Sequence, residues 1–233
     1  EGMKRAIREF GDELRRADVG LFYFAGHGIQ AMGRNFLIPV NAVINSEPEV
    51  EYESIDVGFV LAQMDAAGTP LNIVILDACR NNPFARSFRS AGRGLTQVSA
   101  PTGTLIAYAT APGSVASDGQ GDNGLYTQEL LRFMNTPGLD VEDVFKQVRI
   151  SLIQQTGGEQ TPWESSSLVG DFFFVPTSGQ QLASAPPPQQ QAGIAAGIPA
   201  GVPATSQPQP GPATPETAER LTAVTAPPPG QTD

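Results

Sequence analysis

The chain contains one cysteine and one histidine, and each follows an apolar segment with the composition of a buried strand. Cys79 stands in "NIVILDACRNNPF" (72–84) and His27 in "YFAGHG" (23–28). A thiol of ordinary pKa is mostly protonated at neutral pH. A nucleophilic cysteine therefore needs an imidazole that takes its proton and later donates one to a leaving amine. The pair suggests acyl transfer, with His27 as general base and Cys79 as nucleophile.

The residues beside this pair suit the same chemistry. Gly26 and Gly28 flank His27 and leave room beside the backbone for a substrate carbonyl. The backbone N–H groups of Gly28 and Cys79 are candidates for an oxyanion hole. Asp77, two positions before the cysteine, is a candidate for binding a cationic substrate group through charge-assisted hydrogen bonds.

Apolar runs and helical periodicity predict the elements that must position these groups. Continuous apolar runs predict strands buried on both faces, and amphipathic segments predict helices. The predicted strands are 19–25, 71–76, 104–109 and 171–176, and the predicted helices are 1–18, 55–67, 125–134 and 141–155. Asp140 is the expected N-cap of the last helix.

This alternation predicts an α/β fold with a mainly parallel sheet and helices on both faces, a three-layer sandwich. In such folds functional groups collect at the carboxyl ends of the strands. His27 would lie just beyond the end of one buried strand and Cys79 just beyond the end of the next. The fold therefore predicts that the two residues meet at one edge of the sheet.

Composition divides the chain into a domain, 1–177, and a tail, 178–233, which holds 12 of the 21 prolines and no aromatic residue. Such a tail cannot bury enough apolar area to offset its ordering entropy, so we expect it to be disordered. Because a helical pattern begins at residue 1, we expect the domain to be truncated at its N-terminus.

The charge balance narrows the classes of partner. The chain has 24 acidic and 14 basic residues, a net charge of −10, and no basic helix face, which disfavours nucleic acid. No apolar run approaches the ~20 residues of a membrane span. A single cysteine forms no internal disulfide, so the compartment and the oligomeric state stay open.

Each candidate residue also has a plain structural interpretation. A lone cysteine after a strand is usually a small buried hydrophobe, and a histidine between glycines is often structural. Asp77 could instead cap a backbone turn. The spacing favours function, because His27 and Cys79 are 52 positions apart, close to the separation of about 50 that is typical of one class of cysteine peptidase.

At these residues the chain resembles the caspase-like cysteine peptidases of family C14, in particular their metacaspase and bacterial caspase-domain branch. "YFAGHG" and "LDACRNNPF" resemble the His and Cys motifs. Further similar segments are "NFLIPVNA", "SDGQGDNGLYT" and "QTPWESSSLVGDFFF", so that the resemblance covers roughly residues 1–176. It implies a caspase-like fold with a six-stranded sheet, and endopeptidase activity on proteins or peptides.

One departure from animal caspases concerns specificity. This chain has Asp-Ala-Cys-Arg-Asn at 77–81, where those enzymes carry Gln-Ala-Cys-x-Gly. In metacaspases an Asp two positions before the cysteine lines the S1 pocket, and the family cleaves after Arg or Lys. The resemblance thus implies an S1 role for Asp77. Asp118 is either a second acidic S1 group or a solvated turn residue.

The segment after the nucleophile, 80–103, is a long connection in which we expect self-cleavage after Arg86, Arg89 or Arg93, unless these arginines only form a solvated surface. We expect no metal and no cofactor, since no His/Cys cluster or calcium loop is visible. The alternative to an enzyme is a catalytically silent caspase-like module for binding or scaffolding, tethered by the tail.

Overall fold

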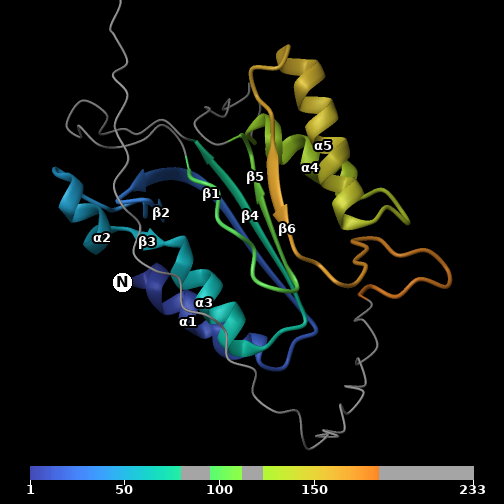
Figure 1. Ribbon diagram of the computed structural model, residues 1–233, viewed down its shortest axis with the longest axis horizontal. Coiled ribbons are helices and arrows are strands. Elements are labelled where there is room, and N and C mark those ends of the chain that lie inside the picture. Colours follow the sequence, from blue (N-terminus) through green and yellow to red (C-terminus); the bar gives the residue numbers. More distant parts are fainter. Residues whose placement is uncertain (80–94, 112–122, 184–233) are drawn as a thin grey trace, which may run out of the picture. The chain divides into compact units, whose positions relative to one another are not determined.

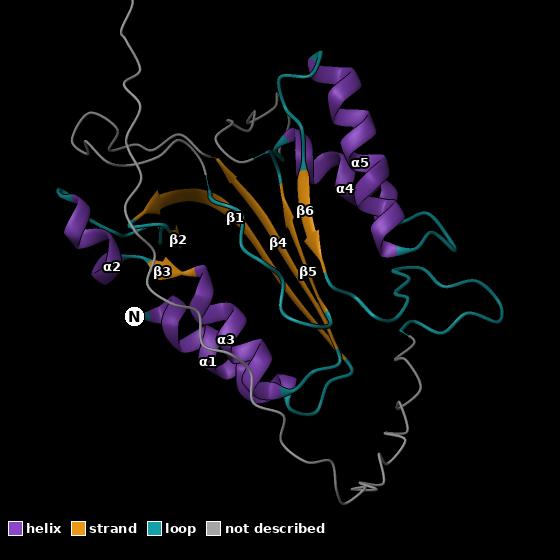
Figure 2. Cartoon of the chain, in the orientation of Figure 1, coloured by secondary structure: helices purple, strands orange, loops and turns teal. Residues whose placement is uncertain are grey.

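Helices cover both faces of a six-stranded sheet in the computed structural model of the chain (Figures 1 and 2). The structure describes residues 1–79, 95–111 and 123–183, all within one compact unit, Glu1–Gln189. One face carries α1 (Gly2–Leu14) and α3 (Val57–Ala67), and the other carries α4 (Leu125–Met134) and α5 (Val141–Thr156). The predicted three-layer α/β sandwich is confirmed.

The sheet is mixed, with the strand order β3-β2-β1-β4-β5-β6. Its long central strands β1, β4 and β5 are parallel, whereas β2, β3 and β6 pair antiparallel to their neighbours. The strands are β1 (Val19–Ala31), β2 (Arg34–Leu37), β3 (Ile55–Asp56), β4 (Leu71–Cys79), β5 (Thr104–Tyr108) and β6 (Trp163–Ser166). The predicted parallel arrangement therefore forms the centre of the sheet, and antiparallel strands form both margins.

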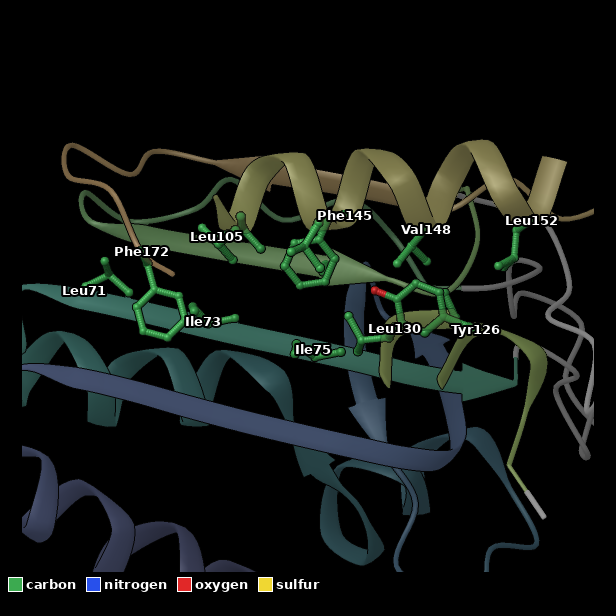
Figure 3. Close-up of a cluster of buried hydrophobic side chains, with 14 residues drawn as sticks. Leu71, Ile73, Ile75, Leu105, Tyr126, Leu130, Phe145, Val148, Leu152 and Phe172 are labelled. Atoms are coloured by element: carbon green, nitrogen blue, oxygen red, sulfur yellow. The ribbon is translucent and has the colours of Figure 1, made fainter. Parts of the chain in front are cut away.

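A cluster of buried side chains joins α4 and α5 to β4 and β5 (Figure 3). Ile73 and Ile75 from β4 lie in this cluster together with Leu130 from α4 and Phe145 from α5. Burying each such side chain contributes roughly 1.5–3 kcal/mol relative to leaving it in water. The expected N-cap also forms, because the Asp140 carboxylate accepts a hydrogen bond from the Glu142 N–H at 2.9 Å.

A second cluster packs α1 and α3 against the opposite face of the sheet. Ile7 and Leu14 are buried on α1, as the helical periodicity predicts. Asp56 caps α3 by accepting a 2.7 Å hydrogen bond from the Gly58 N–H, so this helix begins at Val57 rather than at residue 55. A 3-10 turn (Glu47–Glu49) and the short helix α2 (Val50–Glu53) lead from β2 to β3.

The last predicted strand is wrong. Residues 171–176 form only isolated bridges, Asp140↔Phe173 and Phe172↔Ala183, and the sixth strand of the sheet is β6. Phe172 is buried instead in the cluster that also holds Leu71 and Ile73 of β4 (Figure 3), so its apolar character reflects core burial and not strand pairing. Residues 178–183, assigned to the tail by composition, run beside this segment, with Phe173 N–H donating to Leu182 C=O at 3.0 Å.

The prediction that β1 is buried on both faces is also wrong. Leu21 is 39% exposed and Tyr23 is 42% exposed, because the cluster under α4 and α5 is centred on β4 and β5 and reaches β1 only at Val19. Within the described residues, β1 is paired over Val19–His27 with β4 alone, and pairing with β2 starts at Gly28.

Asn35 of β2 holds the backbone of the segment that leads into β5, at Thr96. Its side-chain amide donates to the Thr96 C=O at 2.7 Å and accepts from the Thr96 N–H at 2.7 Å. Asn35 is 2% exposed and the neighbouring Leu95 is 1% exposed. These two bonds satisfy buried polar groups on both sides and hold Leu95 in the core.

We predict that Asn35→Ala lowers the free energy of unfolding by about 2 kcal/mol, because it leaves the partly buried N–H and C=O of Thr96 without their partner. Urea unfolding of the whole chain measures this effect. The exposed Asn41→Ala serves as the matched control and should change stability little. Equal losses in both variants would show that the two Asn35 bonds are not an anchor.

Candidate functional site

The register between β1 and β4 places the histidine and the cysteine opposite each other. The ladder runs from Val19↔Leu71 to His27↔Cys79, which is its last pair. Neighbouring parallel strands lie about 4.8 Å apart, so the backbones of His27 and Cys79 are adjacent at the carboxyl edge. Both residues lie within the ends of their strands, not beyond them as the sequence indicated.

Asp77 lies two residues before the end of β4 and pairs with Ala25 of β1. It is partly buried and accepts a hydrogen bond of 2.5 Å from the Thr127 hydroxyl, which α4 contributes. Residues two apart on a strand lie on the same face of the sheet. Asp77 therefore shares the face of Ile75, on which α4 packs.

The glycines around His27 have different structural causes. Gly26 has φ +153°, a backbone conformation that residues with a Cβ rarely adopt. Gly28 is buried, and a Cβ built there would lie 2.9 Å from the Ala78 Cβ and 3.1 Å from a methyl of Leu95. Gly28 thus allows β1 to lie close to Ala78 of β4, whereas Gly26 allows the backbone conformation before His27. The assignment of the Gly28 N–H to an oxyanion hole remains a prediction.

A cavity of about 1010 Å³ adjoins His27. Its walls come from the N-terminus of α1, residues 24–27 of β1, the turn after β2 and the segment around Tyr52. The His27 side chain is exposed, and its backbone C=O accepts a 2.9 Å hydrogen bond from the Ile38 N–H. The imidazole is therefore reachable by a ligand, while its backbone is held between β4 and β2.

Tyr126 is a buried residue of α4 and precedes Thr127, the residue that binds Asp77. Its side chain lies in the cluster with Leu130, Phe145 and Val148 (Figure 3), and it is 1% exposed. Its hydroxyl has no hydrogen-bond partner among the described residues. Burial raises the pKa of this phenol well above its ordinary value, and the nearby Asp77 and Tyr23 raise it further, whereas Arg149 lowers it.

Several predicted residues lie outside the described part of the chain. Asp118, the candidate second acidic group, is among them, as are the candidate self-cleavage residues Arg86, Arg89 and Arg93. In the described ranges no group of three His, Cys, Asp or Glu side chains could hold a metal ion. No helix in those ranges is long and apolar enough to cross a bilayer.

Two residues that contact Asp77, directly or through one hydroxyl, were not among the candidates predicted from the sequence. Thr127 binds its carboxylate, and Tyr23 of β1 forms a 2.6 Å hydrogen bond with Thr127. Tyr23 carries the only hydroxyl in the apolar run 19–25, and this could have marked it as a candidate. Trp163, a residue without an assigned role, is 41% exposed and pairs with Tyr108 at the carboxyl end of β5.

Comparison with known proteins agrees with this architecture. The sequence model of Peptidase_C14, described as a caspase domain, matches residues 1–173. Over 132 residues the chain is 29% identical to human mucosa-associated lymphoid tissue lymphoma translocation protein 1, and its mouse homologue shows the same identity. This alignment covers 57% of the chain but only 15% of each relative. The resemblance recognised in the motifs is confirmed.

We predict that Tyr126→Phe leaves the free energy of unfolding at pH 7 unchanged or raises it by up to about 1 kcal/mol, because it removes a buried hydroxyl without a partner. The folded-state pKa of Tyr126 lies above the unfolded value of about 10. The stability that the protonated Tyr126 phenol contributes is therefore fully present below pH 10 and is lost as the pH rises toward the folded-state pKa. The variant should lose less stability in alkali than the wild type.

Urea unfolding at pH 7 and at about pH 11 measures both effects. Tyr52→Phe, at a position that is 76% exposed, is the control. A clear destabilisation of Tyr126→Phe at pH 7 would mean that the hydroxyl has a partner.

Proposed function

Because the chain belongs to the caspase-domain family Peptidase_C14, we propose that it is a cysteine endopeptidase in which His27 and Cys79 form the catalytic dyad. The observation that carries this proposal is the His27↔Cys79 pair at the end of the β1–β4 ladder. Adjacent backbones in one register pair are the arrangement that a dyad exchanging a proton between an imidazole and a thiol requires. The family match alone supports a cysteine peptidase in general.

In the proposed reaction His27 takes the Cys79 thiol proton, and the sulfur attacks the carbonyl carbon of the scissile peptide bond. The N–H groups of Gly28 and Cys79 stabilise the oxyanion. Collapse breaks the C–N bond, and the His27 imidazolium gives its proton to the leaving amine. Water, deprotonated by His27, then cleaves the thioester and releases the acid product and the Cys79 thiol.

The proposed specificity is cleavage after Arg or Lys, with Asp77 as the S1 carboxylate. Its partly buried position on β4 supports this role, since a carboxylate with reduced solvation favours a cation and repels an acidic side chain. Asp77 and Cys79 are two residues apart on one strand. Asp77 would therefore bind the side chain of the same substrate residue, P1, whose carbonyl Cys79 attacks.

The experiment is hydrolysis of fluorogenic peptides that differ only in Arg, Lys or Asp at P1, with Cys79→Ala as the inactive control. We predict that Asp77→Asn lowers kcat/KM for the Arg peptide more than tenfold, which is about 1.4 kcal/mol or more of transition-state stabilisation. The exposed Asp65→Asn is the matched control and should leave the rate unchanged.

Two results would contradict this assignment. Preference for Asp at P1, or an unchanged rate in Asp77→Asn, would remove Asp77 from S1. Absence of any Cys79-dependent hydrolysis would favour the alternative function, a caspase-like module that binds its partners without cleaving them.

A further inference from the structure

Three side chains from three separate elements form a chain of hydrogen bonds at the site. Tyr23 Oη of β1 lies 2.6 Å from Thr127 Oγ1 of α4, and Thr127 Oγ1 lies 2.5 Å from Asp77 Oδ2 of β4. Both distances are at the short end for O–H···O hydrogen bonds. The residues are 104 and 50 positions apart in sequence, so only the tertiary fold brings them together.

The direction of these bonds follows from the number of available protons. A carboxylate only accepts, so the one hydroxyl proton of Thr127 is donated to Asp77. Thr127 Oγ1 must then accept from the Tyr23 phenol, which donates. Burial raises the pKa of Tyr23, the bond to Thr127 lowers it, and the charge of Asp77 raises it, with the net effect that it lies above its ordinary value. The phenol therefore remains a donor at neutral pH.

Thr127, the middle member of this chain of hydrogen bonds, is held by packing. Thr127 is 8% exposed and lies in the first turn of α4, where a β-branched side chain has few rotamers. Tyr126, its neighbour, is anchored in the core between α4 and α5. Thr127 thus presents its hydroxyl to Asp77 from a rigid element, and rigid support is what fixes the orientation of a recognition group.

Orientation matters differently for the two basic side chains. A guanidinium is a planar fork that pairs with a carboxylate through two parallel hydrogen bonds. An ammonium is a compact point charge with three rotatable donors and tolerates a turned carboxylate. A device that fixes the plane of the Asp77 carboxylate should therefore favour Arg over Lys.

We propose that Thr127 and Tyr23 are positioning residues that hold the Asp77 carboxylate in the orientation for bidentate binding of an arginine side chain, and so set a preference for Arg over Lys at P1. This inference rests on the proposed function for the S1 role of Asp77. A purely structural tie between α4 and the sheet would instead change stability and lower activity on both substrates equally.

The test compares kcat/KM for matched peptides with Arg or Lys at P1. Thr127→Val keeps the side-chain shape but removes both bonds, and it should lower kcat/KM for Arg about tenfold and for Lys no more than about threefold. Thr127→Ser should restore the Arg/Lys ratio, and Tyr23→Phe should lower it part of the way. Thr136→Val, at an exposed position after α4, is the control.

A binding measurement separates this inference from the peptidase proposal. N-acetyl-arginine amide and N-acetyl-lysine amide are titrated into the Cys79→Ala protein and followed by NMR shifts, in the Thr127 and Tyr23 backgrounds. If wild type cleaves neither peptide, the peptidase proposal fails, but stronger binding of the arginine amide that Thr127→Val abolishes still supports the inference.

The inference is overturned if the ratio of kcat/KM for the Arg and Lys peptides is the same in wild type and Thr127→Val. It is also overturned if the Arg peptide is not cleaved and N-acetyl-arginine amide does not bind. If the valine variant does not fold, the ratio in Tyr23→Phe decides, because that change leaves Thr127 in place. A ratio equal to wild type there overturns it, and a reduced ratio supports it.

Discussion

The parallel pairing of β1 with β4 is the constraint on which the site depends. The side-chain period of a strand is two, so a slip of one residue in this ladder would turn every side chain of one strand to the opposite face relative to the other. Such a slip would pair Cys79 with Gly26 or Gly28 in place of His27. The register is held because Ile73, Ile75 and Leu76 of β4 are buried between helices on both faces.

The proposed recognition of the substrate side chain depends on a different kind of contact. Asp77 belongs to the same strand as Cys79, so its distance from the cysteine follows from strand geometry alone. Its hydrogen-bond partner Thr127 comes from α4, which packs on that strand through Leu130 and Tyr126. The dyad would thus depend on the sheet, whereas the arrangement of the S1 carboxylate would also depend on the seating of one helix.

These origins explain how much could be predicted from the sequence. The parallel centre, the cap at Asp140 and the approach of His27 to Cys79 follow from local patterns and from the rule that parallel strands end at one edge. The strand β6 could not be recognised, because "WESS" is short, polar and only partly buried. Residues 171–176 were taken for a strand because a loop segment packed in the core has the same apolar composition as a strand buried in a sheet.

Thr127 and the exposure of Tyr23 were not predictable for a related reason. The contact made by Thr127 and the exposure of Tyr23 both depend on how much of the sheet α4 covers. This is set by the packing of the helix and not by the sequence around Thr127 or Tyr23. Thr127 does stand in the segment 117–127 that contributed to the resemblance, but a sequence motif by itself does not reveal the partner of a hydroxyl. The partner became visible only with β1, β4 and α4 in place.

Covalent trapping can show whether His27 activates Cys79 beside a pocket that accepts arginine, as proposed. The chain is incubated at neutral pH with a peptidyl chloromethyl ketone that ends in arginine and, separately, with its aspartate counterpart, and the adducts are mapped by mass spectrometry. We predict rapid alkylation of Cys79 by the arginine reagent alone, and loss of this alkylation in His27→Ala. Equal, slow labelling by both reagents, unaffected by His27→Ala, would contradict it.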